Sequence, residues 1–352
     1  MDSITHLFYG GVIAAAIAPR AHRRAALLAG AAINTLPDLD VIPLLLLSDD
    51  PVQRMTWHRA ATHSWLVLPF VAWALWAFFR RRGGRVAQAP RRWWWAIFVC
   101  MMAHPLLDSF TVYGTQLLWP LPLRPLMWSS LFIVDPLFTL PWLLAFALAL
   151  VAGARRWGTP VLACGIALGV GYLGWSLAAK TLIERQAGAS LAQMGLADAP
   201  RFSVPMPLTT LLWREVAMTP DGYVEGFRSL VADRGPMVFV PHRCDQAALA
   251  QTRALPAVQR LEWFTRGFVC AQAQDDVLVL DDLRMGSEGD YFFRFAVARR
   301  SGVGWVSMPP QQLRGEPADP GVLWDAIWVR IWRPAQAATG SSGVTPAASA
   351  SK

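Results

Sequence analysis

The sequence predicts an α-helical domain that crosses a membrane several times, followed by a smaller, water-facing β-rich domain of the α+β type. The 352-residue chain is 54% hydrophobic, has 18 tryptophans and only 16% charged residues. This composition is more apolar than that of ordinary soluble domains. Long apolar segments fill the first half, and arginines gather after every second one. Beyond residue 180 the pattern changes to short strand-like runs.

Residues 1–179 contain six apolar segments, and a hydrocarbon core takes about 20 residues to cross. The first and third segments are short, and INTLPDLDVIP interrupts the second. We therefore expect about four to six of them to form the membrane domain, with some tilted or re-entrant. The start MDSITH lacks the basic residues of a cleavable signal peptide. The segments are 7–19, 25–47, 65–79, 93–110, 131–153 and 159–179.

Arginine placement predicts the orientation of the chain. Arginines follow the first, third and fifth segments, whereas loops 48–64 and 111–130 hold only three arginines and no lysine. Cytoplasmic loops are the ones enriched in basic residues, so both termini are expected outside. Much of the +8 net charge lies in these loops. It indicates topology and attraction to anionic lipid, and no nucleic-acid partner is expected.

Residues 180–335 are expected to form an extracytoplasmic, β-rich domain. Turn signals such as TPDGY and MGSEGD separate β-branched and aromatic runs such as MVFV, VLVL and YFFRFAVA. Cys244 and Cys270 both fall in this domain. Outside the cytoplasm they can form a disulfide, and two free buried thiols are the alternative. The small, polar tail 336–352 is expected to be disordered.

Ionisable residues that do not suit a membrane core gather at one predicted membrane face. The stretch MMAHPLLDSF places His104 and Asp108 four residues apart, and hence on one side of a helix. An imidazole and a carboxylate so placed can bind one metal ion or two neighbouring ions. Metal binding also explains how such groups escape the cost of unpaired burial in a bilayer. The same face is expected to hold His6, Asp38, Asp40, His58, His63 and Asp135.

Local patterns refine this set. PDLD, with prolines at positions 37 and 43, predicts an extended turn. His58 and His63 are five residues apart, about 140° around an ideal helix, so both can bind metal only if a loop or a helix end intervenes, and otherwise one of them has a second role. Asp135 precedes a proline and is expected to cap a helix.

Five successive stretches resemble the YdjM/YbcI-like family of bacterial membrane-bound, metal-dependent hydrolases. They are MDSITHLFYGG, LPDLD, WHRAATHS, AHPLLDSFTVYGTQLLWP and IVDPLFT, and the match covers residues 1 to about 155. The family is in turn similar to the zinc-dependent phospholipase C and single-strand nuclease superfamily. The resemblance implies a hydrolase of the bacterial inner membrane with one or two divalent ions, zinc first. Its matching metal candidates are His6, Asp38, Asp40, His58, His63, His104 and Asp108.

The expected reaction is hydrolysis of an ester or phosphoester in an amphipathic, lipid-linked substrate at the outer membrane face. Asp40, or else Asp38, whichever does not bind metal, is the expected general base, and His63 is the expected acid. An alternative stays open, in which a non-enzymatic envelope protein uses the cluster as a structural metal site or ion-binding site and its outer domain binds a partner. No HExxH, GxSxG or GxxxxGK[ST] motif is present, which excludes the enzyme classes that depend on them.

Overall fold

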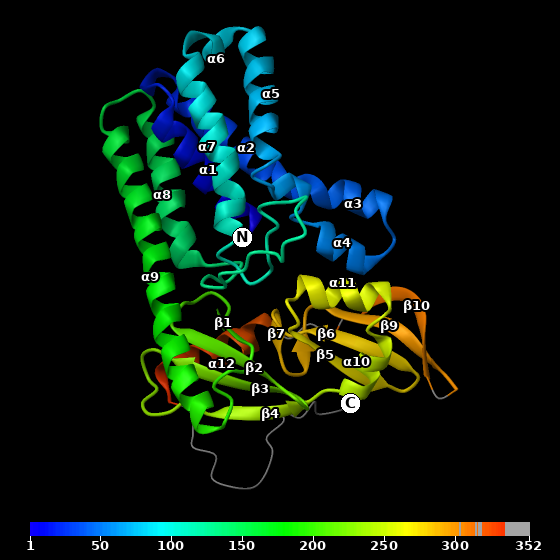
Figure 1. Ribbon diagram of the computed structural model, residues 1–352. Coiled ribbons are helices and arrows are strands. Elements are labelled where there is room, and N and C mark those ends of the chain that lie inside the picture. Colours follow the sequence, from blue (N-terminus) through cyan, green and yellow to red (C-terminus); the bar gives the residue numbers. More distant parts are fainter. Residues whose placement is uncertain (303, 314, 316–318, 335–352) are drawn as a thin grey trace, which may run out of the picture.

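The computed structural model describes residues 1–302, 304–313, 315 and 319–334. Helices make up the first half of the chain, and antiparallel β-sheets dominate the second half (Figure 1). The predicted fold class, a helical domain followed by a β-rich domain, is therefore confirmed. The tail 336–352, predicted to be disordered, lies outside the described residues.

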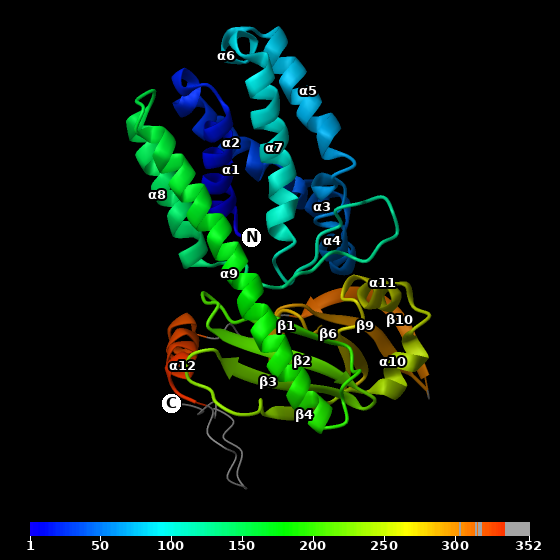
Figure 2. The same ribbon diagram turned by 60° about the vertical axis from the view of Figure 1, so that its left-hand side comes forward.

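The helical domain is a bundle with a bent extension at its lower end (Figures 1 and 2). Its long helices are α1 (Ser3–Ile17), α2 (Arg23–Thr35), α5 (Leu68–Arg81), α7 (Pro90–Asp108), α8 (Pro136–Ala152) and α9 (Gly158–Gln193). Its short elements are η1 (Arg20–His22), η2 (Pro37–Asp40), α3 (Val41–Leu47), α4 (Pro51–Trp57), η3 (Ala61–His63) and α6 (Gly84–Gln88).

By length and apolar composition, two helical segments of the described chain are long enough to cross a membrane. They are Arg20–Leu47 and Gly158–Gln193. The pair Pro51–His63 and Leu68–Arg81 adds a third if its 57° bend lies within one span. Ser3–Ile17 and Pro136–Ala152 are shorter apolar helices. A multi-pass arrangement of four to six segments stays a prediction.

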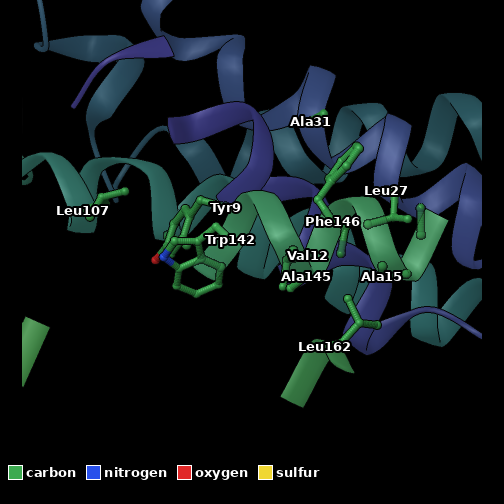
Figure 3. Close-up of a cluster of buried hydrophobic side chains, with 14 of the residues drawn as sticks. Tyr9, Val12, Ala15, Leu27, Ala31, Leu107, Trp142, Ala145, Phe146 and Leu162 are labelled. Carbon is green, nitrogen blue, oxygen red and sulfur yellow. The ribbon is translucent and has the colours of Figure 1, made fainter. Parts of the chain in front are cut away.

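The bundle core depends on small residues that let helices approach closely. A side chain on Gly10 would lie 2.6 Å from the carbonyl oxygen of Gly30, so this pair of glycines allows α1 and α2 to touch. Larger side chains fill the space towards α8 (Figure 3), where the rings of Tyr9 and Trp142 meet edge to face at 4.7 Å. Lipid offers helices no hydrophobic drive to associate. Close packing of this kind is what holds such a bundle together.

The break in the second apolar segment differs from the prediction. Pro37–Asp40 forms a 3-10 turn, and Leu36 before it is helical, with φ −57° and ψ −43°. The predicted extended turn is therefore wrong: the helices on both sides outweigh the tendency of a residue before proline to extend. Beyond the turn, α3 runs crosswise to the bundle helices (Figure 1). Its direction places it along the bundle's end rather than through it.

Two four-stranded antiparallel sheets and a short hairpin form the β-rich part. The first sheet has the order β1 (Arg201–Pro205), β2 (Leu212–Thr219), β3 (Gly222–Ser229), β4 (Phe239–Arg243). The second has the order β10 (Gly304–Leu313), β9 (Arg294–Ser301), β6 (Val277–Asp282), β5 (Val269–Gln274). The hairpin pairs β7 (Gly286–Ser287) with β8 (Asp290–Tyr291), and the helices are α10 (Gln246–Thr252), α11 (Pro256–Phe264) and α12 (Pro320–Trp332).

The two halves of the chain pack together through buried side chains. Val52 and Met55 of α4 share one apolar cluster with residues of α10, α11 and the second sheet. The helix α9 passes from the bundle to the first sheet (Figure 2), so the expected domain boundary at residues 179–180 falls inside it. Cys244 and Cys270 form a disulfide between the end of β4 and β5. Of the two alternatives left open by the sequence, the structure has the bonded pair.

Among the described residues of the β-rich part, Glu215 is a buried carboxylate without a hydrogen-bond partner. Glu215 on β2 is 0% exposed, and neither of its carboxylate oxygens accepts a hydrogen bond from the described residues. Its nearest cation, Arg201, has Nε 3.9 Å from Oε1. Burial raises the pKa of Glu215 to about 8, against the opposing charges of Lys180 and Arg201. The folded protein therefore favours the protonated acid.

We expect Glu215→Gln to flatten the pH dependence of stability. An unfolded glutamate ionises near its ordinary pKa of 4.5, whereas the folded one resists ionisation up to about 8. The wild type should lose stability as pH rises through this window, on the order of 4 kcal/mol. Thermal unfolding in detergent at pH 5 and pH 8 measures it. An equal fall in Tm for wild type and variant would contradict the assignment.

Candidate metal centre

Four separate segments bring polar side chains together at the lower end of the bundle. His6 comes from α1, and Asp38 and Asp40 come from η2. His58 directly follows α4, His63 is the last residue of η3, and the last turn of α7 provides a histidine and an aspartate. The two histidines of WHRAATHS do not share one helix, since α4 stops at Trp57, before His58, and His63 belongs to η3. All seven residues expected from the sequence therefore meet in one region of the fold.

Four of these residues form a group that could hold a metal ion. One ligand atom from each of Asp38, His63, His104 and Asp108 lies within 4.8 Å of all the others. Asp108 Oδ2 is 3.1 Å from His63 Nε2 and 3.4 Å from His104 Nε2. The two histidine Nε2 atoms are 3.0 Å apart. Histidine nitrogens and carboxylate oxygens are the ligands that zinc takes in proteins.

The environment of the group fits a bound cation. His63, His104 and Asp108 are fully buried, and Asp38 has 17% of its side chain exposed. Asp38 Oδ1 and Asp108 Oδ2, both turned towards the histidines, are buried atoms with no hydrogen-bond partner among the described residues. Buried acceptors of this kind are costly when left unsatisfied. A divalent ion between the four side chains would satisfy them.

His6 lies behind this group and supports it. Its Nε2 is 3.1 Å from the other oxygen of Asp108, Oδ1, and its Nδ1 is 3.1 Å from Asn34 Oδ1. Its ring stacks on His104 with centroids 3.9 Å apart. A histidine hydrogen-bonded to a ligand carboxylate orients that carboxylate. The geometry therefore suits His6 as an orienting residue.

Asp40 and His58 form a second pair beside the group. Asp40 Oδ1 lies 2.7 Å from His58 Nδ1. The other oxygen of Asp40 accepts hydrogen bonds from the Arg59 backbone N–H at 3.2 Å and the Thr62 hydroxyl at 2.8 Å. His58 is the more open of the two, with 18% of its side chain exposed. Its Nδ1 is thus held by a carboxylate, while the ring remains accessible.

Arg59 belongs to the site although sequence analysis missed it. Its Nη2 lies 3.2 Å from Asp108 Oδ1, and its Nη1 donates to the Thr111 hydroxyl at 3.1 Å. The guanidinium covers the ring of Tyr113 at 4.9 Å. Its backbone φ is +62°, a conformation that non-glycine residues adopt rarely and often at functional sites. No local signal in WHRAATHS marks this arginine as a residue of the site.

Two further polar residues take structural positions. Asn34 donates to the carbonyl of Cys100 at 2.6 Å and contacts His6, so it links α2 to α7 and α1. A polar side chain inside INTLPDLD was the available signal for it. Asp135 caps α8 by accepting from the Phe138 backbone N–H at 3.0 Å. The expectation that Asp135 is a helix cap is confirmed.

The fold and this site define a membrane protein with a buried His/Asp group compatible with a metal ion. A family model described as YdjM inner membrane protein matches residues 1–183. This is more than half of the chain, and the protein belongs to that family. The match contains every residue of the site and ends within α9. Comparison with curated proteins and with solved structures found no match.

We expect His104→Ala and Asp108→Ala each to abolish metal binding, because each removes a ligand from the group of four. Elemental mass spectrometry of the detergent-purified protein measures metal per chain. His22→Ala is the matched control, since His22 contacts Gln88 and Trp93 away from the site. A wild type that takes up no divalent ion, even after reconstitution, would refute the metal centre.

Proposed function

We propose that this protein is a metal-dependent hydrolase that cleaves an ester or phosphoester of an amphipathic, lipid-linked substrate at the outer face of the bacterial inner membrane. The group Asp38, His63, His104 and Asp108 is the observation on which the proposal depends. Membership of the YdjM inner membrane protein family supports the inner membrane as the location. A purely structural metal site would not need the accessible Asp40–His58 pair beside it.

The residues of the group would hold one or two divalent ions, with zinc the first candidate. When bound, such an ion lowers the pKa of water and polarises the bond to be cleaved. The carboxylates of Asp38, Asp40 and Asp108 supply negative charge at the site, and the guanidinium of Arg59 and the amino group of Met1 both contact Asp108. The carboxylates exceed these cations in number, which favours a bound cation.

Proton transfer is best assigned to the Asp40–His58 pair. Asp40 holds Nδ1 of His58 at 2.7 Å, which fixes the ring and leaves Nε2 to exchange a proton with water or a leaving group. The sequence had suggested Asp40 as base and His63 as acid. His63 Nε2 already faces Asp38 and Asp108 within the group, so we assign His63 to metal binding. Asp40 keeps a role as the orienting carboxylate.

Arg59 is suited to hold negative charge that develops on the substrate. Its guanidinium is buried, with one nitrogen on Asp108 and one on Thr111, while Nε has no hydrogen-bond partner in the described chain. A fixed donor in a water-poor site stabilises developing charge far better than one in water. Arg59 would therefore act as the clamp for a carbonyl or phosphoryl oxygen.

The charge distribution and the disulfide support the proposed orientation. Arginine-rich turns lie at the end of the bundle away from the site, and such turns favour the cytoplasm. The Cys244–Cys270 disulfide suits an oxidising compartment. Together they support an extracytoplasmic β-rich domain and a metal centre at the outer lipid boundary. A substrate whose apolar part lies in the bilayer reaches such a site directly.

Hydrolysis should require His58 for proton transfer and not for metal binding. We expect His58→Gln to lower turnover by roughly 10²–10⁴-fold with unchanged metal content. The assay uses bis(p-nitrophenyl) phosphate and p-nitrophenyl butyrate, which separate phosphoester from ester cleavage. His242→Gln is the control, because His242 stacks on Tyr223 in the β-rich part. If the metal-loaded wild type cleaves neither compound nor phosphatidylglycerol vesicles, the hydrolase proposal fails.

The orientation is tested by cysteine labelling in a Cys164→Ser background. Arg124→Cys, in the loop that follows α7 at the same end of the bundle as the site, should react with a membrane-impermeant maleimide added to intact spheroplasts. Arg85→Cys, in the arginine-rich turn, should react only after lysis. Both positions are exposed. The reverse pattern would place the metal centre in the cytoplasm.

A further inference from the structure

A cleft of about 470 Å³ lies between the end of α4, the loop 116–122 and α11. This volume is within the range of ligand sites in proteins, ~300–1,000 Å³. Three tryptophans, an arginine and two glutamines line it together with prolines, and none of them belongs to the metal-binding group. These six residues are Trp57, Trp119, Trp263, Arg260, Gln116 and Gln259.

Arg260 is held in place inside the cleft. Its guanidinium lies 4.4 Å from the ring centroid of Trp263 and 5.7 Å from that of Trp57. Its Nε donates to the Thr56 hydroxyl at 2.9 Å, and its Nη2 donates to the Thr56 carbonyl at 3.1 Å. Neither hydrogen bond uses Nη1, which stays available to a ligand. A guanidinium fixed in this way is a pre-formed donor for an anion, because little side-chain freedom remains to be lost on binding.

Apolar side chains are exposed on a wall of the cleft and on a neighbouring helix. The loop that forms one wall exposes Leu118, Leu121 and Leu123. The helix α3, which packs against α4 and does not itself line the cleft, exposes Leu46 at 79% and Leu47 at 83%. Leucines so exposed are explained by contact with lipid.

We propose that this cleft binds the headgroup of a phospholipid in the leaflet nearest the metal centre. The phosphate would bind Arg260 Nη1, since guanidinium and phosphate form strong charge-assisted hydrogen bonds. The tryptophans have the amphipathic rings that favour the headgroup level of a bilayer. The acyl chains would lie against the exposed leucines of the loop that forms the wall. A free phosphate ion has no apolar part that would contact this apolar rim.

The cleft also adjoins the metal centre. Trp57 is followed directly by His58, and the Gln116 backbone N–H donates to the carbonyl of Arg59 at 3.0 Å. A lipid bound in the cleft would thus lie on the side where His58 is accessible. That the bound lipid is also the substrate rests on the proposed hydrolase function. The proposed binding of the lipid does not rest on that function.

Lipid binding is tested by native mass spectrometry of the full-length, detergent-purified protein titrated with dioleoyl phosphatidylglycerol. We expect Arg260→Gln to weaken binding at least tenfold, as expected for the loss of a hydrogen bond to a charged group. Arg253→Gln is the matched control, because Arg253 is an exposed arginine that pairs with Glu262 outside the cleft. It should bind like the wild type. Equal affinity of Arg260→Gln and the wild type would overturn the proposal.

Two further ligands in the same measurement distinguish a phospholipid from a lipid without phosphate and from free phosphate. Dioleoylglycerol, which has the same tails without phosphate, should bind much more weakly, and equal binding would refute phosphate recognition. Inorganic phosphate should not displace the lipid at millimolar concentration, and displacement would identify a free-phosphate site instead. If Arg260→Gln fails to fold, Trp57→Ala decides, because this tryptophan is 47% exposed. Several-fold weaker binding supports the cleft, and unchanged binding overturns it.

The outcomes for the cleft and for the hydrolase are distinct. Arg260-dependent lipid binding without any hydrolysis would keep the cleft and remove the proposed function. Hydrolysis of the soluble esters with lipid binding that ignores Arg260 would keep the function and remove the cleft.

Discussion

The carboxylate of Asp108 is fully buried at the end of an apolar helix bundle. The segments around it supply partners for this buried charge. An isolated buried charge costs several kcal/mol. Asp108 is instead met by His6 from α1, by Arg59 after α4 and by His63 in η3, and the amino group of Met1 also contacts it. Because these partners come from separate segments, their contacts hold the ends of the helices in one arrangement. The same arrangement places the metal-binding group.

The β-rich part takes part in this arrangement although it supplies none of the four candidate ligands. Arg284, fully buried and paired with Asp282, donates to the carbonyl of Tyr113 at 2.9 Å. The ring of Tyr113 in turn packs against Phe264 of α11 and lies under the guanidinium of Arg59. The loop that follows α7 is thus held from the β-rich side. A wall of the metal centre therefore depends on residues far along the chain.

Composition and helix geometry were enough to predict the two halves of the fold and the gathering of ionisable residues, because apolar length, arginine position and the spacing of His104 and Asp108 are local properties. The turn at PDLD was predicted wrongly, because the flanking helices outweigh the tendency of a residue before proline to be extended. Arg59 could not be found, because its contact with Asp108 is purely tertiary. The pairing of Cys244 with Cys270 likewise depends on how β4 and β5 are placed.

The helix α9 has 36 residues without a break, and so a length of about 54 Å. A continuous helix has no hinge, and here it joins the bundle to the first sheet. The distance between the bundle and the first sheet is therefore set by the helix itself. A force applied to the sheet would be transmitted along the helix axis to the bundle, because no bending joint between them absorbs it.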